Sequence, residues 1–234
     1  MLAVYKRELN SYFNSMIGYI FIAILVCLVG FYFMVINMYN GYPNFSYVLL
    51  STLFIFLVTI PILTMKSMAD DKRAKTDQLL LTSPVSLTGL VMGKYLSMVT
   101  VFAVPTLIFC LCPLIIKING TSALLSDYSS IFAFFLMGCA YIAIGMFISS
   151  LTESQAIAAV GTFAALLVLY LWDTIVGYLP NAVSGILSGF SFVGVFNNFA
   201  QYQVFDIGGL VLYLSVAFVF IFLTVQTLQK RRWS

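Results

Sequence analysis

Charge is absent from two long stretches of this chain. Residues 9–65 contain no Asp, Glu, Lys or Arg, and neither do residues 95–116. A run of roughly 20 apolar residues is long enough to cross a bilayer as a helix. Hydrophobic residues make up 62% of the sequence and charged residues 8%, which excludes a soluble fold because soluble domains are roughly 25% charged. The chain is therefore predicted to be an all-α, polytopic membrane protein.

We expect one domain, residues 1–234, with six transmembrane helices and no linker or repeat. The predicted spans cover residues 17–38, 47–65, 95–116, 129–151, 156–172 and 207–227. A turn is expected at residues 37–46, a cytoplasmic loop at residues 66–94 and a short polar connection at residues 117–127. Residues 177–205 are too broken by Gly, Pro and Asn for a span and too apolar for a free loop. We therefore expect short re-entrant or interfacial helices there, at the outer face.

The distribution of basic residues predicts the orientation. Six spans put both termini on one side of the membrane, and ten of the eleven Lys and Arg residues fall on that side. Lys117 alone falls on the other. Because cytoplasmic segments are enriched in Lys and Arg, both termini and the 66–94 loop are predicted to be cytoplasmic. Asp70 and Asp71 are then expected to be solvated in that loop.

Residues 1–16 have the pattern of an amphipathic helix. At 100° per residue, one arc holds Leu2, Tyr5, Leu9, Tyr12, Phe13 and Met16. The opposite side is polar and includes Lys6 and Arg7. Such a helix is suited to lying along the lipid headgroups. The alternative is a fraying start to the first span. The residues assigned to this interface are Tyr5, Lys6, Arg7, Leu9, Tyr12 and Phe13.

Within the polar loop, a short helix is predicted at residues 77–83. Thr76 can cap its N-terminus, and Asp77 lies in the first turn, where a carboxylate favours the helix dipole. Pro84 ends the helix. Three consecutive leucines in an otherwise polar segment need a surface that covers them, so we expect this segment to dock on a partner. The residues concerned are Thr76, Asp77, Gln78, Leu79, Leu80, Leu81, Thr82, Ser83 and Pro84.

No pattern typical of catalysis or metal binding is found. The chain has no His, which is the commonest metal ligand and general base at neutral pH. The four cysteines lie inside apolar runs and are expected to be buried hydrophobes without disulfides. Asp173 and Glu153 are interpreted as residues at helix ends. Residues 89–95, GLVMGKY, lack the spacing and the Ser or Thr of a phosphate-binding loop. We expect no catalytic residue and no metal site, and the sequence does not identify a substrate-binding residue.

Four segments, in order, resemble the ABC-2 type permease family, the membrane subunits of bacterial ABC exporters. The resemblance is closest to the short six-span group that includes the gliding-motility F-type permease. The segments are residues 5–19 (YKREL, YF and IGY), residues 70–96 (with SPV and GKYL), residues 145–156 and residues 222–233. Lys75 stands where the family has Gly, and Asp77 stands where it has Glu.

The resemblance implies a role and partners. Two permease chains, identical or different, would form the pathway, and two copies of a separate ABC ATPase subunit would bind ATP and Mg²⁺. The chain itself would bind no cofactor. Residues 77–83 would form the helix that couples ATPase to permease. The second and fifth spans would line the pathway, and residues 177–205 would form its outer gate. The implied location is the bacterial cytoplasmic membrane, and the implied direction is export.

Two other classes of function are considered. An intramembrane enzyme, such as a protease or a lipid transferase, needs a cluster of buried polar residues, and the sequence does not predict one. A channel or scaffold that needs no ATPase would leave the leucines of residues 77–83 without a partner surface. Both alternatives are less consistent with the sequence than a permease.

Overall fold

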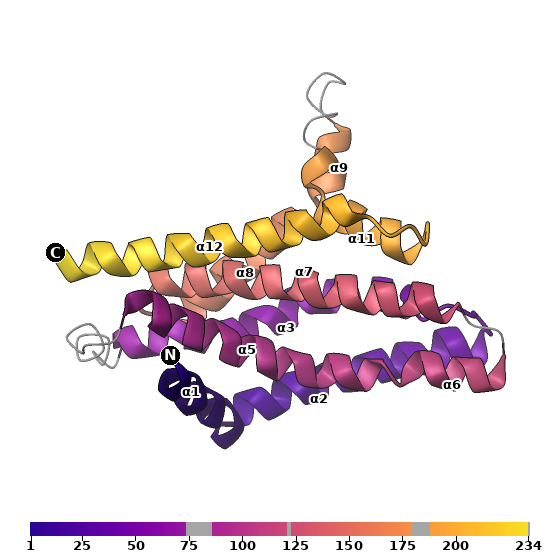
Figure 1. Ribbon diagram of the computed structural model, residues 1–234, viewed down its shortest axis with the longest axis horizontal. Helices are drawn as coiled ribbons and strands as arrows, with labels where there is room; N and C mark the ends of the chain where they lie inside the picture. Colours follow the sequence, from indigo (N-terminus) through magenta and orange to yellow (C-terminus); the bar gives the residue numbers. More distant parts are fainter. Residues whose placement is uncertain (74–85, 121–122, 179–187, 234) are drawn as a thin grey trace.

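The computed structural model describes residues 1–73, 86–120, 123–178 and 188–233, and across these ranges the regular structure is helical. Within these ranges, five helical stretches are long and apolar enough to cross a membrane. They run roughly along the long axis of the molecule (Figure 1). They are Met16–Tyr39, Ser46–Arg73, Leu87–Ile118, Leu124–Leu151 and Ile207–Lys230. This confirms a polytopic, all-α membrane protein.

The predicted fifth span is a shorter helix than the others. Helix α8 (Gln155–Tyr170) has 16 residues, and at 1.5 Å per residue it is ~24 Å long. The hydrocarbon core of a bilayer is about 30 Å thick, so α8 is not long enough by this measure alone. After α8 the chain turns into α9 (Trp172–Gly177), which projects away from the bundle (Figure 1).

Both predicted boundaries of the 66–94 loop are wrong. Helix α3 (Ser46–Arg73) continues through Lys66, and α5 (Leu87–Phe109) begins before Lys94. The predicted loop begins and ends at its first and last charged residues, because charged side chains are expected to lie in water. In the structure, Asp71 and Lys94 instead form an ion pair between the two helices. The helices can therefore include these charged residues.

The predicted connection at residues 117–127 is also wrong in its bounds. Helix α5 is interrupted at Cys110, and α6 (Cys112–Asn119) continues past Lys117 with Pro113 in its first turn. Helix α7 (Leu124–Leu151) then includes Asp127. Proline lacks a backbone N–H, so the first turn is the part of a helix that accepts it without loss. The predicted turn at residues 37–46 overlaps η1 (Met34–Tyr39), a π-helix that extends α2 (Met16–Phe33).

Helix α7 is the centre of the bundle and packs against α3, α5, α8 and α12 (Ile207–Trp233). Its rings stack with those of its neighbours: the centroids of Phe134 and Phe56 are 4.5 Å apart. Two glycines allow close approach. A Cβ at Gly138 would lie 2.3 Å from a ring carbon of Phe102, and one at Gly145 would lie 2.4 Å from Oγ1 of Thr64. Small residues of this kind allow close helix packing in membranes.

Part of the predicted outer segment is helical and well packed. The structure has a 3₁₀ turn, η2 (Ser188–Phe190), followed by α11 (Phe192–Ala200). Phe192, Phe196 and Phe199 are buried, and α11 packs against α7 and α12. Residues 179–187 lie outside the described residues. Below, the end of the bundle that carries both chain termini is called the α1 end, and the opposite end, beside α6, is called the α6 end (Figure 1).

Candidate functional site at the α1 end of the bundle

A buried lysine joins three helices at the α1 end. The Nζ atom of Lys94, in α5, lies 2.6 Å from Oδ2 of Asp71 and 3.3 Å from Oε1 of Glu8. It also donates a hydrogen bond of 2.6 Å to the carbonyl oxygen of Ser67. The Lys94 side chain is only 3% exposed, whereas those of Glu8 and Asp71 are 14% and 17% exposed. An almost fully buried ammonium needs such partners, because an unpaired charge there would be costly.

Helical spacing brings these groups together. Ser67 and Asp71 are four residues apart in α3, so both lie on one face and both reach Nζ of Lys94. Glu8 comes from α1 (Leu2–Asn14), which packs against α5. Gly93 makes this contact possible, since a Cβ there would lie 3.1 Å from Cγ1 of Val4. We call Glu8, Ser67, Asp71 and Lys94 the Lys94 cluster.

Two tyrosines of α1 strengthen its contact with the bundle. The hydroxyls of Tyr5 and Thr100 are 3.0 Å apart, and the hydroxyl of Tyr12 donates to the carbonyl oxygen of Leu63 at 3.3 Å. Burial is the main cause that raises the pKa of Tyr12, and the charge of Glu8 raises it further. The Tyr12 hydroxyl therefore stays protonated and can donate its hydrogen bond to the carbonyl oxygen of Leu63.

The predicted apolar arc of α1 is thus divided between two surroundings. Tyr12 is buried, and Tyr5, Leu9 and Phe13 are partly buried against the protein. Leu2 and Met16, by contrast, are 82% and 80% exposed. Lys6 and Arg7 are exposed, as the pattern predicts. Helix α1 therefore has one side packed against the protein and an exposed apolar residue near each end. This arrangement is compatible with a position at the membrane surface.

The last turns of α3 also contact α7 and α8. The backbone N–H groups of Met68 and Ala69 both donate to Oγ of Ser149, at 3.2 Å each. Nζ of Lys72 donates to the carbonyl oxygen of Ser150. On the other side of α3, Asp70 accepts a hydrogen bond from the side-chain amide of Gln155 at the start of α8. The expectation that Asp70 and Asp71 are solvated is therefore wrong.

The predicted coupling residues, 76–84, lie outside the described residues. The structure does describe the chain on both sides of them. Before them, α3 ends at Arg73, two residues after the Lys94–Asp71 ion pair. After them, Ser86 caps α5 by accepting a hydrogen bond from the N–H of Gly89 at 3.3 Å, and Lys94 follows two turns later. The Lys94 cluster therefore joins the two helices that lead into and out of residues 76–84.

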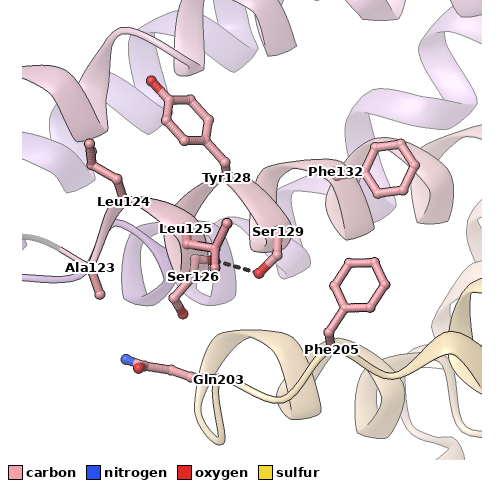
Figure 2. Close-up of a pocket in the computed structure, with 9 residues that line it drawn as sticks. All are labelled: Ala123, Leu124, Leu125, Ser126, Tyr128, Ser129, Phe132, Gln203 and Phe205. Atoms are coloured by element: carbon pink, nitrogen blue, oxygen red, sulfur yellow. Dashed lines mark hydrogen bonds between the residues drawn. The ribbon is translucent and has the colours of Figure 1, made fainter.

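Two of the cavities formed by the described residues that lie away from this cluster are large enough for a small molecule. One, of about 680 Å³, is at the α6 end, between the start of α7 and the segment that precedes α12. Figure 2 shows Phe132 and Phe205 beside each other on one side of it and Gln203 on the other. Gln203 has a φ of +53°, a backbone conformation that favours glycine. None of the nine residues that line the cavity is acidic or basic, so they offer neutral hydrogen-bonding groups and aromatic rings.

The second cavity, of about 640 Å³, lies between α7, α8 and α12 and is lined by apolar side chains, among them Phe147, Trp172 and Phe220. The first cavity is lined by the hydroxyl groups of Ser126, Tyr128 and Ser129, but no acidic or basic residue lies beside them in its lining. The second cavity can hold an apolar molecule.

Sequence reasoning missed two of the buried charged residues, Lys94 and Asp127; Lys72 is buried as well. Lys94 was taken as the end of a loop, and Asp127 as part of a connection, yet Asp127 is fully buried and accepts a hydrogen bond of 2.9 Å from the N–H of Phe45. The sequence shows that Lys94 is a single charge at the edge of an apolar run. It does not show that Asp71, one of several charged residues at residues 70–75, is its partner.

Comparison with known protein families places most of the chain in one family. Residues 27–206, well over half of the chain, match the family described as ABC-2 family transporter protein. A comparison with curated proteins gives no match.

Proposed function

Because the chain belongs to the ABC-2 transporter family, and is therefore a multi-pass membrane permease subunit of ABC-type transport, we propose that it couples to a separate ABC ATPase through residues 77–83. Two ATPase copies and two permease chains, identical or different, would make up the transporter. ATP and Mg²⁺ would be held by the ATPase. Leu79, Leu80 and Leu81 would be the apolar anchor, since buried apolar anchors dominate the energy of interfaces.

The observation that carries this proposal is the Lys94 cluster. A docking segment can transmit movement only if its two ends are joined to the rest of the protein. The helices on both sides of residues 76–84 are joined to each other by the Lys94–Asp71 ion pair and to α1 by Glu8. Displacement of the docked segment would therefore move the ends of α3 and α5 together, along with α1.

In this proposal the chain crosses the membrane six times, with α8 as the fifth crossing. The short length of α8 would be compensated by α9 or by local thinning of the bilayer. Both termini and residues 74–86 would face the cytoplasm, because ten of the eleven basic residues then lie on the cytoplasmic side. The bilayer would be the bacterial cytoplasmic membrane.

The pathway would lie along α3 and α8, which pack against each other, with residues 177–205 as the gate at the far side. Transport would be outward. The apolar cavity between α7, α8 and α12 favours substrates with apolar parts, such as lipids, peptides or hydrophobic drugs.

The test is co-purification of the detergent-solubilised permease with a candidate ABC ATPase. Leu80→Asp should abolish co-purification, because the carboxylate would have to be buried in the ATPase surface. Leu125→Asp is the matched control: Leu125 is 88% exposed at the α6 end, so the same chemical change should leave association intact. Both variants should elute from size exclusion as the wild type does.

Retention of the ATPase by the Leu80→Asp variant would exclude residues 77–83 as the docking segment. If the wild type itself bound no ATPase, a channel or scaffold would replace the transporter as the better explanation.

A further inference from the structure

A small polar cavity lies next to the Lys94 cluster, between α1 and the last turns of α3. It has a volume of about 270 Å³, and every one of its nine lining residues has a polar side chain. Three of them are basic and three are acidic: Arg7, Lys66, Lys94, Glu8, Asp70 and Asp71. A polar cavity in a protein that is otherwise so apolar needs a polar occupant or water.

The charges around this cavity are not all matched by the protein. Lys94 pairs with the carboxylates of Glu8 and Asp71. Asp70 has a neutral hydrogen-bond partner, Gln155. Arg7 and Lys66 have no ion-pair partner among the residues that the structure describes. The cavity therefore offers the two cations Arg7 and Lys66 toward an anionic group and the carboxylate of Asp70 toward a cationic group.

The surroundings of the cavity supply the apolar surface that a lipid needs. Ser11 and Ser15 line the cavity where α1 leads into α2. Directly after them, at the start of α2, Met16, Tyr19 and Ile20 are 80%, 59% and 44% exposed. Since α2 begins a helix that can span the membrane, these side chains face lipid. A molecule with its polar head in the cavity can lay its acyl chains along them.

We propose that this cavity binds the headgroup of a zwitterionic aminophospholipid. Arg7 and Lys66 would hold the phosphate diester, since guanidinium and ammonium groups form strong, charge-assisted hydrogen bonds with phosphate oxygens. Asp70, with Glu8 nearby, would accept hydrogen bonds from the primary ammonium group. Basic pockets between membrane helices bind lipid headgroups in this way. The proposal requires only that the chain is a membrane protein. It does not depend on an ATPase or on which side of the membrane the α1 end faces.

The experiment measures lipid retained by the full-length, detergent-purified protein in native mass spectrometry. Three phospholipids with the same acyl chains are added separately: phosphatidylethanolamine, phosphatidylcholine and phosphatidylglycerol. The wild type should retain phosphatidylethanolamine best, because phosphatidylcholine cannot donate hydrogen bonds from its quaternary ammonium and phosphatidylglycerol has no cation. Arg7→Gln and Lys66→Gln should each lower retention about fivefold, the effect of one basic residue at a membrane surface.

Two variants make the test specific. Lys6→Gln removes the same charge from the same helix, but Lys6 does not line the cavity, so its retention should equal that of the wild type. Asp70→Asn keeps a hydrogen-bond acceptor while removing the negative charge, so the preference for phosphatidylethanolamine over phosphatidylglycerol should disappear.

Each opposite outcome overturns the proposal. Equal losses in Lys6→Gln and Arg7→Gln would mean that α1 attracts lipid through its general positive charge. Equal retention of all three lipids by the wild type would exclude recognition of the ammonium group. If Arg7→Gln and Lys66→Gln changed association with the ATPase and left lipid retention unaltered, the cavity would belong to a protein interface.

Discussion

The two ends of the helical bundle satisfy their carboxylates in different ways. At the α1 end, Glu8 and Asp71 pair with the ammonium group of Lys94. At the α6 end, Asp127 accepts a hydrogen bond from the backbone N–H of Phe45, just before α3, and Asp206 accepts one from the N–H of Gly209, in the first turn of α12. Glu8 and Asp71 thus use a cation, whereas Asp127 and Asp206 use N–H groups at helix starts.

The difference follows from the direction of the helices. Both α3 and α12 begin at the α6 end (Figure 1), so their unpaired N–H groups and the positive ends of their dipoles lie there. Helices α3 and α7 end at the α1 end, where Lys72 donates to the carbonyl oxygen of Ser150 in the last turn of α7. N–H groups at helix starts thus serve the carboxylates of Asp127 and Asp206 at the α6 end, and a carbonyl oxygen at a helix end serves the ammonium group of Lys72 at the α1 end.

If the α1 end depends on its ion pairs, Lys94→Met should have the largest effect of any single change compared here. It leaves two carboxylates without their cation, and breaking a buried pair in this way costs about 3 kcal/mol. Thermal unfolding in detergent measures it. The matched control is Lys117→Met, at an exposed position in α6, which should leave the unfolding temperature unchanged.

The same site allows a rescue. Adding Glu8→Gln and Asp71→Asn to Lys94→Met should restore most of the lost stability, because no uncompensated charge is then buried. A triple variant as unstable as Lys94→Met alone would show that packing of the lysine stem, and not charge pairing, stabilises this end.

At the α6 end, Asp127→Ala should cost less, about 1–2 kcal/mol, which is the usual cost of losing a helix N-cap. Asp127→Asn should be milder still, since the amide oxygen can accept the hydrogen bond from Phe45. The same thermal unfolding experiment ranks the variants. The comparison between the two ends fails if Asp127→Ala destabilises the protein more than Lys94→Met does.

The smallest effect is expected at Asp206 and should appear only in acid. Hydrogen bonds from the Asn198 side chain and from the N–H of Gly209 hold the pKa of Asp206 below its ordinary value of 3.8. A carboxyl with a lowered pKa binds fewer protons in the folded state. Its stabilisation is therefore complete above pH 4 and is lost as the pH falls below that value.

Unfolding curves of the wild type and of Asp206→Asn between pH 7 and pH 3 measure this contribution as a difference. The difference in unfolding temperature should shrink as the pH falls. A difference that stayed constant across this range would mean that the charge of Asp206 does not stabilise the start of α12.

The sequence predicts the positions of the long apolar helices better than it predicts their ends, and it predicts six spans where five helices of the described residues are long enough. Hydropathy depends on composition alone, so the stretches that became α2, α3, α7 and α12 are recognisable from their charge-free runs. The position at which a helix ends depends on whether a charged side chain forms an ion pair or hydrogen bond with a residue of another helix. Nothing within α3 indicates that Asp71 will pair with Lys94, 23 positions later. From the sequence, a charged residue inside a helix therefore cannot be distinguished from one at which the helix ends.

The candidate site was only partly predictable for the same reason. The pattern of residues 1–16 predicts a helix with an apolar arc, and α1 is that helix. That the arc would pack on α5 follows from Gly93, where the absence of a side chain leaves room for Val4, and one glycine among 15 gives no signal of this kind. The Lys94 cluster combines residues from three helices, and only the tertiary structure brings them together.

The hydroxyl of Ser149 has a consequence for how the protein can move. It accepts hydrogen bonds from two consecutive N–H groups near the end of α3, while Asp127, at the other end of the same helix α7, holds the start of α3. The two helices run parallel and are joined near both ends, so sliding one along the other would break these hydrogen bonds. A tilt or rotation of α3 and α7 together would keep them.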